Sequence, residues 1–391
     1  MLQILVRKLT SSPIRNCLPV ALCLTSSLVA LVVSLSASAI AQDNPRLAVP
    51  ATVVRELTPP GTANGFLRPG GIFADNRFAE VYVSDMGNNR IVVFDTSGLY
   101  KFEFSGNDIF GTPGDVVVDS RGFIYVTGST ASGKGIYLFD YDGLYLRELQ
   151  LSGLPQGLTP NISHLTIDES DNLYVIDGTK AIVFAFDTQG TLRQQFSVLT
   201  DVPEKERREA MFGAPRIFAG SIYLPVSTFG TVYVYDLSGN FVRNIGGEGT
   251  DIGTLNFPVD VAVSPDSIVM VLDKHRYNVV CFSIDGQFLG EFGGMGFRRG
   301  WFYHPNSFAI DNRGRCYISQ IFLNLVQVCD LPKFIVEKAK SLTIKHSQSN
   351  SNSLRPESAC GEEVTRQLTT VLLRSFYSST FQFISWRFFY A

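Results

Sequence analysis

The feature that most constrains the fold of this 391-residue chain is a segment that occurs in five copies at an almost constant spacing. The copies cover residues 81–104, 124–149, 173–196, 222–245 and 269–292. Each contains a turn of the form x-x-Gly, and these glycines follow one another at intervals of 45, 47, 49 and 47 residues. They are Gly98, Gly143, Gly190, Gly239 and Gly286. A period in this range, with several strands in each repeat, is typical of a β-propeller.

Each copy resolves into four strands, which we call a, b, c and d. In the second copy strand a covers residues 115–119, strand b 124–127 and strand c 136–140, and a more polar strand d follows the x-x-Gly turn. Unbroken apolar runs in strands a and c indicate strands that neighbouring blades cover on both faces. Glycine supplies the positive φ that the c–d turn requires. The sequence therefore predicts an all-β propeller of four-stranded antiparallel blades.

A sixth blade begins at Ser307 and continues to residue 330, but it lacks the x-x-Gly turn and its own strand d. Residues 52–57 parallel the strand d of other copies, so we expect this N-terminal strand to complete the sixth blade and close the ring. Closure removes the open sheet edges that would otherwise pair with other chains. The alternative is that residues 334–336 supply the missing strand.

The repeats resemble the NHL family. The resemblance is carried by "SDMGNNRIVVFDTSG", by "DNRGRCYISQ" and by the inter-blade stretch "FGGMGFRRGWFYHPNSFAIDNRGRCYIS". It covers roughly residues 51–332 and implies a six-bladed propeller. The family contains binding modules and enzymes, so the resemblance does not decide the function.

Residues 1–41 have the pattern of a signal peptide. Arg7, Lys8 and Arg15 precede an apolar stretch from about residue 18 to 40, and a small-x-small site ends at Ala41. We expect a periplasmic or secreted protein, or a membrane-anchored one if residues 18–40 are not cleaved. Without this segment the chain has 33 − 3 = 30 basic against 36 acidic residues. That balance argues against a nucleic-acid partner, which needs a basic face.

The predicted domains are a signal peptide at 1–41, a propeller at 42–332, a disordered polar linker at 333–361 and a tail at 362–391. The tail has apolar residues at helical spacing and many aromatics. Three alternatives stay open for it: docking on the propeller, contact with a membrane, or non-native sequence from a reading-frame error. We expect membrane contact only through this tail or an uncleaved N-terminus.

Chain direction places the d–a and b–c loops on one face of the propeller and the short a–b and c–d turns on the other. Long loops on a rigid scaffold are where binding usually occurs. We therefore expect a protein or peptide partner on the long-loop face. The insert at 200–212 predicts a short helix with Asp201 as its N-cap. The binding-face candidates are Glu204, Arg207, Arg208, Arg298, Arg299 and Trp301.

Strand a lines the central channel, and its polar residues are candidates for a ligand or metal site. Asp115, His164, Asp260 and Ser307 occupy equivalent positions in four repeats, Arg216 and Asn306 lie one step from that position, and His304 lies at the mouth. The alternative, which we favour, is a hydrated channel lined by whatever polar groups fit. We expect no cofactor, with calcium or another divalent metal left open.

The alternative to a binding scaffold is a hydrolase or lactonase-like enzyme with a site in the channel. NHL-like peptidyl-hydroxyglycine lyases hold zinc through histidines just after the proline that opens strand a. If this chain resembled them in activity, it would have histidines at the same positions. Here those positions hold Gly114, Ser163, Val259 and Asn306, which argues against that activity. Calcium-dependent lactonases on similar propellers use acidic and amide side chains in the channel, and Asp115, Asp260 and Asn306 leave that option open.

Two short patterns complete the predictions. The stretch "GSTASGKG" at 128–135 resembles a phosphate-binding loop, but Gly135 stands where Ser or Thr should be and a strand follows instead of a helix. We interpret it as a b–c loop. Cys316 and Cys329 align with Val81 and Phe94 of the first copy, so they should be cross-strand neighbours that form either a disulfide or a pair of buried thiols.

Overall fold

The structure is a computed structural model that describes residues 49–353, apart from 61–64, 107–108 and 131–132. The predicted signal peptide and the predicted C-terminal tail both lie outside the described residues. The chain divides into one unit that ends at Ala339 and a second that begins at Lys340. The first unit contains the propeller, and the sites described below all lie in it.

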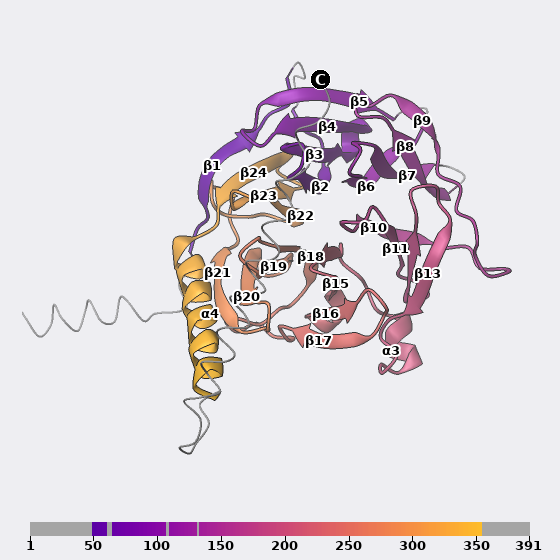
Figure 1. Ribbon diagram of the computed structural model, residues 1–391. Coiled ribbons are helices and arrows are strands. Elements are labelled where there is room, and N and C mark those ends of the chain that lie inside the picture. Colours follow the sequence, from indigo (N-terminus) through magenta and orange to yellow (C-terminus); the bar gives the residue numbers. More distant parts are fainter. Residues whose placement is uncertain (1–48, 61–64, 107–108, 131–132, 354–391) are drawn as a thin grey trace, which may run out of the picture. The chain divides into compact units, whose positions relative to one another are not determined.

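Six four-stranded antiparallel sheets stand around a central channel (Figure 1). In each sheet the first strand lines the channel and the fourth lies at the rim. Blades 1 to 3 are β2 (Pro69–Asp75), β3 (Glu80–Asp85), β4 (Arg90–Asp95) and β5 (Tyr100–Ser105); β6 (Thr112–Val118), β7 (Ile124–Thr130), β8 (Gly133–Phe139) and β9 (Tyr145–Glu148); and β10 (Ile162–Ile167), β11 (Leu173–Asp177), β12 (Ile182–Phe186) and β13 (Leu192–Ser197). Blades 4 to 6 are β14 (Arg216–Phe218), β15 (Ser221–Val226), β16 (Thr231–Asp236) and β17 (Phe241–Ile245); β18 (Pro258–Val263), β19 (Ile268–Asp273), β20 (Asn278–Ser283) and β21 (Phe288–Gly293); and β22 (Pro305–Ile310), β23 (Arg315–Gln320) and β24 (Leu325–Asp330), completed by β1 (Thr52–Leu57).

The N-terminal strand closes the ring, as predicted. β1 pairs antiparallel with β24, and the register joins Thr52 to Asp330 and Leu57 to Val326. The alternative strand at 334–336 is wrong, because these residues belong to the helix α4 (Lys333–Ser353). β1 already occupies the outer position of blade 6, which leaves no partner for a second strand there.

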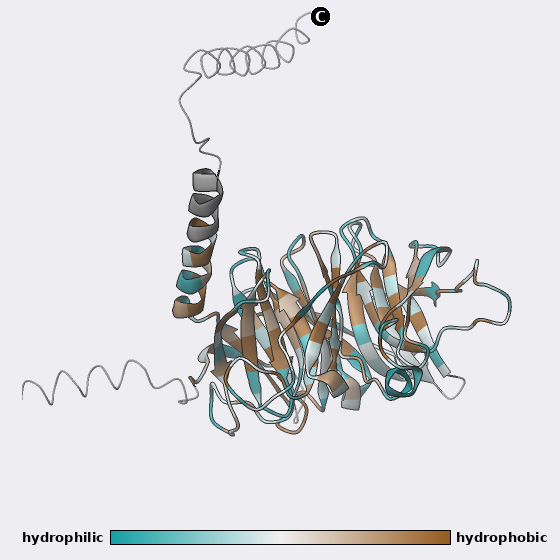
Figure 2. Ribbon diagram, turned by 90° about the horizontal axis from the view of Figure 1, so that it is seen from below, coloured by the Kyte–Doolittle hydropathy of each residue, from teal (hydrophilic) through white to brown (hydrophobic). Residues whose placement is uncertain are grey.

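Apolar cores lie in the seams between blades, where β-sheet faces meet. One core joins Val93 of blade 1 to Val118 and Phe139 of blade 2, and another joins Val81 and Phe94 of blade 1 to blade 6. Brown, apolar residues accordingly run through the strands, while the loops at both ends are mostly teal (Figure 2). The predicted apolar runs of strands a and c therefore correspond to two-sided burial.

Residues 333–361 were predicted to be a disordered linker. This prediction is wrong for residues 333–353, which form the helix α4. Gly290 of β21 leaves room for Phe334 and Ile335, since a Cβ at Gly290 would lie 2.7 Å from the Phe334 ring. Ile335 is fully buried, and the Lys338 ammonium lies 5.3 Å from the centre of the Phe288 ring. The signal was the apolar Phe-Ile-Val run, which starts a helix rather than a strand. Among the described residues no helix is long and apolar enough to span a bilayer.

The insert between blades 3 and 4 holds the predicted short helix, α3 (Glu204–Arg208), at the rim of the ring (Figure 1). Its N-cap is Pro203, which makes no side-chain cap bond, so the prediction of Asp201 as N-cap is wrong. Proline cannot donate a backbone hydrogen bond and its fixed φ suits the start of a helix, which explains why the helix begins directly after it.

Candidate functional site at the mouth of the channel

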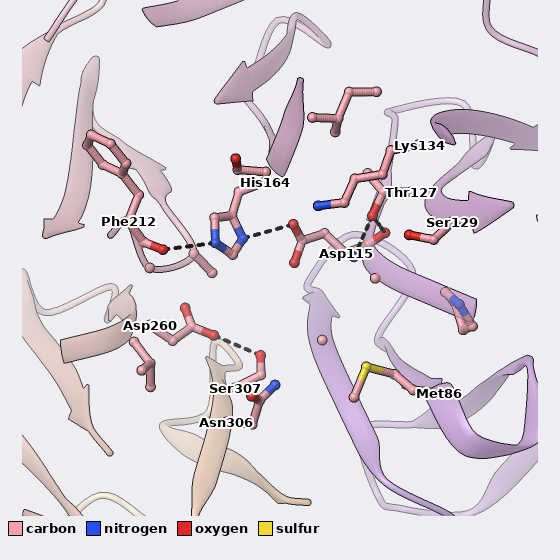
Figure 3. Close-up of a pocket in the computed structure, with 18 of the residues that line it drawn as sticks. Met86, Asp115, Thr127, Ser129, Lys134, His164, Phe212, Asp260, Asn306 and Ser307 are labelled. Atoms are coloured by element: carbon pink, nitrogen blue, oxygen red, sulfur yellow. Dashed lines mark hydrogen bonds and ion pairs between the residues drawn. The ribbon is translucent and has the colours of Figure 1, made fainter. Parts of the chain in front are cut away.

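A cavity of about 380 Å³ lies at one end of the central channel (Figure 3). Its walls come from d–a loops, represented by Phe212 and Phe257, and from b–c loops, represented by Met86 and Lys134. The cavity therefore opens on the face that the long loops form. A volume of this size falls in the range of roughly 300–1,000 Å³ that is typical of small-molecule sites.

One position of strand a forms a ring around the channel. The pairing of each strand a with its strand b aligns the members of this ring as Gly71, Asp115, His164, Ala214, Asp260 and Ser307. Four of them were predicted. Arg216 pairs with Tyr223 and so lies two residues beyond Ala214, which corrects the prediction of a single step. Asn306 directly precedes Ser307, as predicted, and lines the cavity.

Three polar side chains of this ring each join one blade to the next. Oδ2 of Asp115 accepts a hydrogen bond from the backbone N–H of Leu165 at 3.0 Å. Oδ2 of Asp260 accepts from the N–H of Phe308 at 2.8 Å, and Oγ of Ser307 accepts from the N–H of Ile72 at 3.0 Å. Each bond pairs a backbone N–H of an innermost strand, which has no further strand beside it to accept that hydrogen. The ring is therefore in large part structural.

His164 has an acceptor on each side of its ring (Figure 3). Nδ1 lies 3.1 Å from Oδ2 of Asp115, and Nε2 lies 3.2 Å from the carbonyl oxygen of Phe212. Only the imidazolium form can donate from both nitrogens. Burial lowers the pKa of His164, but the Asp115 carboxylate and the two hydrogen bonds outweigh it and raise the pKa overall. The geometry thus favours a charged His164 that has no free nitrogen.

Asp260 is only 1% exposed and accepts three hydrogen bonds. Besides the bond from Phe308, Oδ2 accepts from Oγ of Ser307 at 2.7 Å, and Oδ1 accepts from its neighbour's N–H, that of Val261, at 2.8 Å. Burial raises the pKa of Asp260 to about 6, although the Arg216 guanidinium, 4.0 Å away, acts in the opposite direction. This carboxyl is therefore close to half neutral near pH 6.

The ligand sets that calcium and zinc require can be compared with the described residues of the channel. In the described part of the chain, no group of three His, Cys, Asp or Glu side chains is placed to hold a metal. Ca²⁺ takes about six to eight oxygen ligands, whereas the oxygens of Asp260 are already occupied by neighbouring donors. The residues present do not fit the metal that the lactonase resemblance would require.

Other groups at the mouth are free to meet a ligand. Lys134 is exposed, forms no ion pair within the described residues, and extends over the cavity (Figure 3). It lies on the hairpin of β7 and β8, opposite Ser129. The stretch "GSTASGKG" thus connects strands b and c, as predicted, but residues 128–130 belong to β7 and 133–135 to β8 rather than to a loop. Sequence analysis missed Lys134 as a site residue, although its position on a b–c loop was itself the signal.

His304 does not line the channel, contrary to the prediction. It lies among aromatic rings, with its centroid 5.6 Å from that of Tyr277, 4.6 Å from Tyr303 and 4.8 Å from Phe322. Phe297 joins the cluster through Tyr303 at 4.5 Å. Phe297 and Phe322 are exposed, at 68% and 65%. Adjacent loops of blades 5 and 6 hold these rings together, which the sequence alone does not reveal.

The predicted binding-face residues do not converge on one site. Glu204, Arg207 and Arg208 lie on α3 beside blades 3 and 4, where Arg208 pairs with Glu204. Arg298 and Arg299 lie between β21 and β22, and both are exposed. Nε of Arg299 lies 3.5 Å from Oε1 of Glu56 on the closing strand. Trp301 is half-buried and lies against Gly296 of the same loop.

The predicted register of the two cysteines is confirmed, since Cys316 pairs directly with Cys329, as Val81 does with Phe94. Both are buried free thiols, so the disulfide is not formed in this structure. Burial, together with the neighbouring Cys329 and Cys281 thiols, raises the pKa of Cys316 well above its usual value. Burial also raises the pKa of Cys329 to about 12.

Comparison with known proteins supports the fold alone. No protein-family model matches the sequence, and no curated protein matches it. A streptogramin B lyase structure superposes with a TM-score of 0.50 at 12% identity, over 71% of this chain and 97% of the lyase. A protein of unknown function from Bacteroides thetaiotaomicron gives 0.51 at 14% identity, over 71% and 72%. The Cps50 (Swd1) propeller domain of Myceliophteria thermophila gives 0.52 at 8% identity, over 72% and 100%.

Proposed function

We propose that this protein is an exported binding scaffold, built from NHL-type repeats, that holds a ligand or a partner's side chain in the mouth of its channel. The observation that carries the proposal is the convergence of d–a and b–c loops around a cavity of about 380 Å³. Apolar walls with a few free polar groups are the usual composition of a binding site. Met86, Met211 and Phe257 supply the apolar surface, and Lys134 and Asn306 supply the polar groups.

A binding role is favoured over an enzymatic one by the state of the His164–Asp115 pair. A general base needs a free nitrogen within reach of the substrate's proton. Both nitrogens of His164 face acceptors of this chain, and Asp260 is occupied by three donors. The lyase similarity adds no argument for catalysis, because at this level of identity it concerns the fold alone.

The experiment is a comparison of matched variants in capture from periplasmic extract or culture medium, with the propeller as bait. Met211→Asp places a charge on the apolar wall of the mouth, and Lys134→Glu reverses its free charge. Both should abolish capture of the same species, while melting temperatures stay within a few degrees of the wild type. Alanine replacements across 200–212 and at Arg298 and Arg299 test how far the partner extends over the long-loop face.

Phe241→Ala is the control, because Phe241 is exposed at the start of β17, next to the c–d turn of the other face. It should capture the partner normally. If Phe241→Ala loses the partner and Met211→Asp keeps it, the assignment of the binding face is wrong.

A further inference from the structure

A second cavity opens at the other end of the channel, on the face of the short a–b turns. It has a volume of about 250 Å³. Its rim carries Asn76, Glu169 and Pro265, which are exposed residues of three a–b turns. Polar and apolar atoms contribute about equally to its wall, and its apolar lining residues include Phe73 and Phe218. We refer to this cavity as the lower cup.

Arg216 lies at the inner end of the lower cup. Its side chain lines both the lower cup and a small cavity of about 20 Å³ in the middle of the channel. Asp260 also lines that middle cavity but not the cup. The layer of Arg216 and Asp260 therefore separates the lower cup from the mouth where Lys134 lies.

Within the described part of the chain, the Arg216 guanidinium has only long contacts with other residues. Nε lies 3.5 Å from the carbonyl oxygen of Val261, and Nη2 lies 3.4 Å from that of Phe308 and 4.0 Å from Oδ1 of Asp260. Hydrogen bonds of this kind are usually about 2.7–3.2 Å long. The side chain is 22% exposed although it lies inside the channel, so the cavities account for its accessible surface.

A half-buried guanidinium with long contacts, next to a cavity with apolar residues in its wall, has the two elements of a site for an amphipathic anion. Its planar N–H groups match a carboxylate, which can accept two parallel hydrogen bonds. An apolar cavity of about 150 Å³ is enough to admit benzene, so the lower cup has room for one ring or a short branched chain beside the carboxylate.

We propose that the lower cup binds a small monocarboxylate with a compact apolar body, its carboxylate on Arg216 and its body between Phe73 and Phe218. This site is separate from the mouth of the channel and does not depend on the function proposed for it. Glu169 is the acidic group on the rim, and it disfavours entry of dianions.

The test measures binding of 3-phenylpropionate to the full chain by calorimetry, with the neutral 3-phenylpropionamide as the matched ligand. The carboxylate should bind and the amide should bind at least roughly tenfold more weakly, since a hydrogen bond to a charged group is worth about 1.5–3 kcal/mol. Arg216→Gln should weaken the carboxylate by a similar factor and leave the amide unchanged. Glu169→Gln should strengthen the carboxylate.

Two cations serve as controls. Lys134→Gln removes the charge at the other end of the channel, and Arg313→Gln removes an exposed charge on the same face but outside the cup. Neither should change the affinity. If Arg216→Gln does not fold, Ala74→Leu fills the cup and keeps the charge, and it should abolish binding. Equal affinity for carboxylate and amide, no binding at millimolar concentration, or unchanged binding in Ala74→Leu would each overturn the proposal.

Discussion

The Nδ1 atom of His164 in β10 lies 3.1 Å from Oδ2 of Asp115 in β6, so a charged hydrogen bond crosses the seam between blades 2 and 3 at the mouth of the channel. The same carboxylate oxygen accepts the backbone N–H of Leu165. Two bonds from blade 3 thus converge on one atom of blade 2, and this seam should respond to the protonation of His164.

The first prediction is that His164 stabilises the fold more at acidic pH than at alkaline pH. Its pKa is raised in the folded state, so its contribution is complete below the unfolded value of about 6.5 and is lost as the pH rises through the folded pKa. His164→Gln should therefore cost about 1–3 kcal/mol more at pH 5.5 than at pH 9. Urea unfolding of both proteins at the two pH values measures this, and equal differences would contradict it.

The second prediction concerns Asp260, whose effect on stability changes with pH in the opposite direction from that of a salt-bridged carboxylate. Its pKa is raised to about 6 by burial, so the folded state holds a proton that the unfolded state releases near pH 4, and stability falls as the pH rises from about 4 to 6. Asp260→Asn removes this loss, which amounts to roughly 3 kcal/mol at neutral pH.

We expect Asp260→Asn to show a flatter profile of unfolding urea concentration between pH 4 and 6 than the wild type. The amide oxygen still accepts the bonds from Ser307 and Phe308, whereas the amide nitrogen cannot accept the bond from Val261, a loss that is the same at every pH. Asp260→Ala is the control, since it leaves those donors unpaired and should destabilise by about 2 kcal/mol. A steeper pH profile in Asp260→Asn would show that another group causes the dependence.

The third prediction concerns ring closure. Leu57 of β1 is buried in the core between blades 1 and 6. Leu57→Ala should therefore cost about 2–5 kcal/mol, and deletion of residues 42–60 should cause aggregation or a large fall in melting temperature because it exposes the edge of β24. Val54→Ala is a control within the same strand, since Val54 is exposed. Melting curves and light scattering measure both effects, and an unchanged melt in the deletion would argue against closure by β1.

The fourth prediction is that Cys316 and Cys329 stay reduced and unreactive in the native protein. Only a thiolate attacks a disulfide reagent, and burial raises the pKa of both thiols. Ellman's reagent should label neither residue under native conditions and both in guanidinium. Peptide mass mapping after alkylation provides the check. A linked peptide pair in protein purified without reductant would instead show that the cross-strand bond forms.

The fold was predictable because every copy of the repeat contains the same pattern of strands and turns. The blade order, the closing strand and the Cys316–Cys329 register all follow from aligning one unit with another. An error in one copy changes little, since the remaining copies fix the same pattern.

The candidate site was only partly predictable, because it depends on contacts between blades. Alignment found Asp115 and His164 as equivalent residues but not as neighbours joined across a seam. It misplaced Arg216 by one residue, because blade 4 begins with only three paired residues in β14. It also placed His304 in the channel, whereas the positive φ of 47° at this residue accompanies its packing among Tyr277, Tyr303 and Phe322.

The pairing of Thr52 with Asp330 determines when the ring can close during biosynthesis. These partners are 330 − 52 = 278 positions apart, and a ribosome adding about 5–20 residues per second needs on the order of 15–60 s to make the intervening chain. Throughout that time residues 52–57 remain a strand without a partner, and every nascent ring is open. A chain that stalls before residue 325 never forms the strand on which β1 pairs. This segment can therefore pair only when translation has nearly reached the end of the propeller.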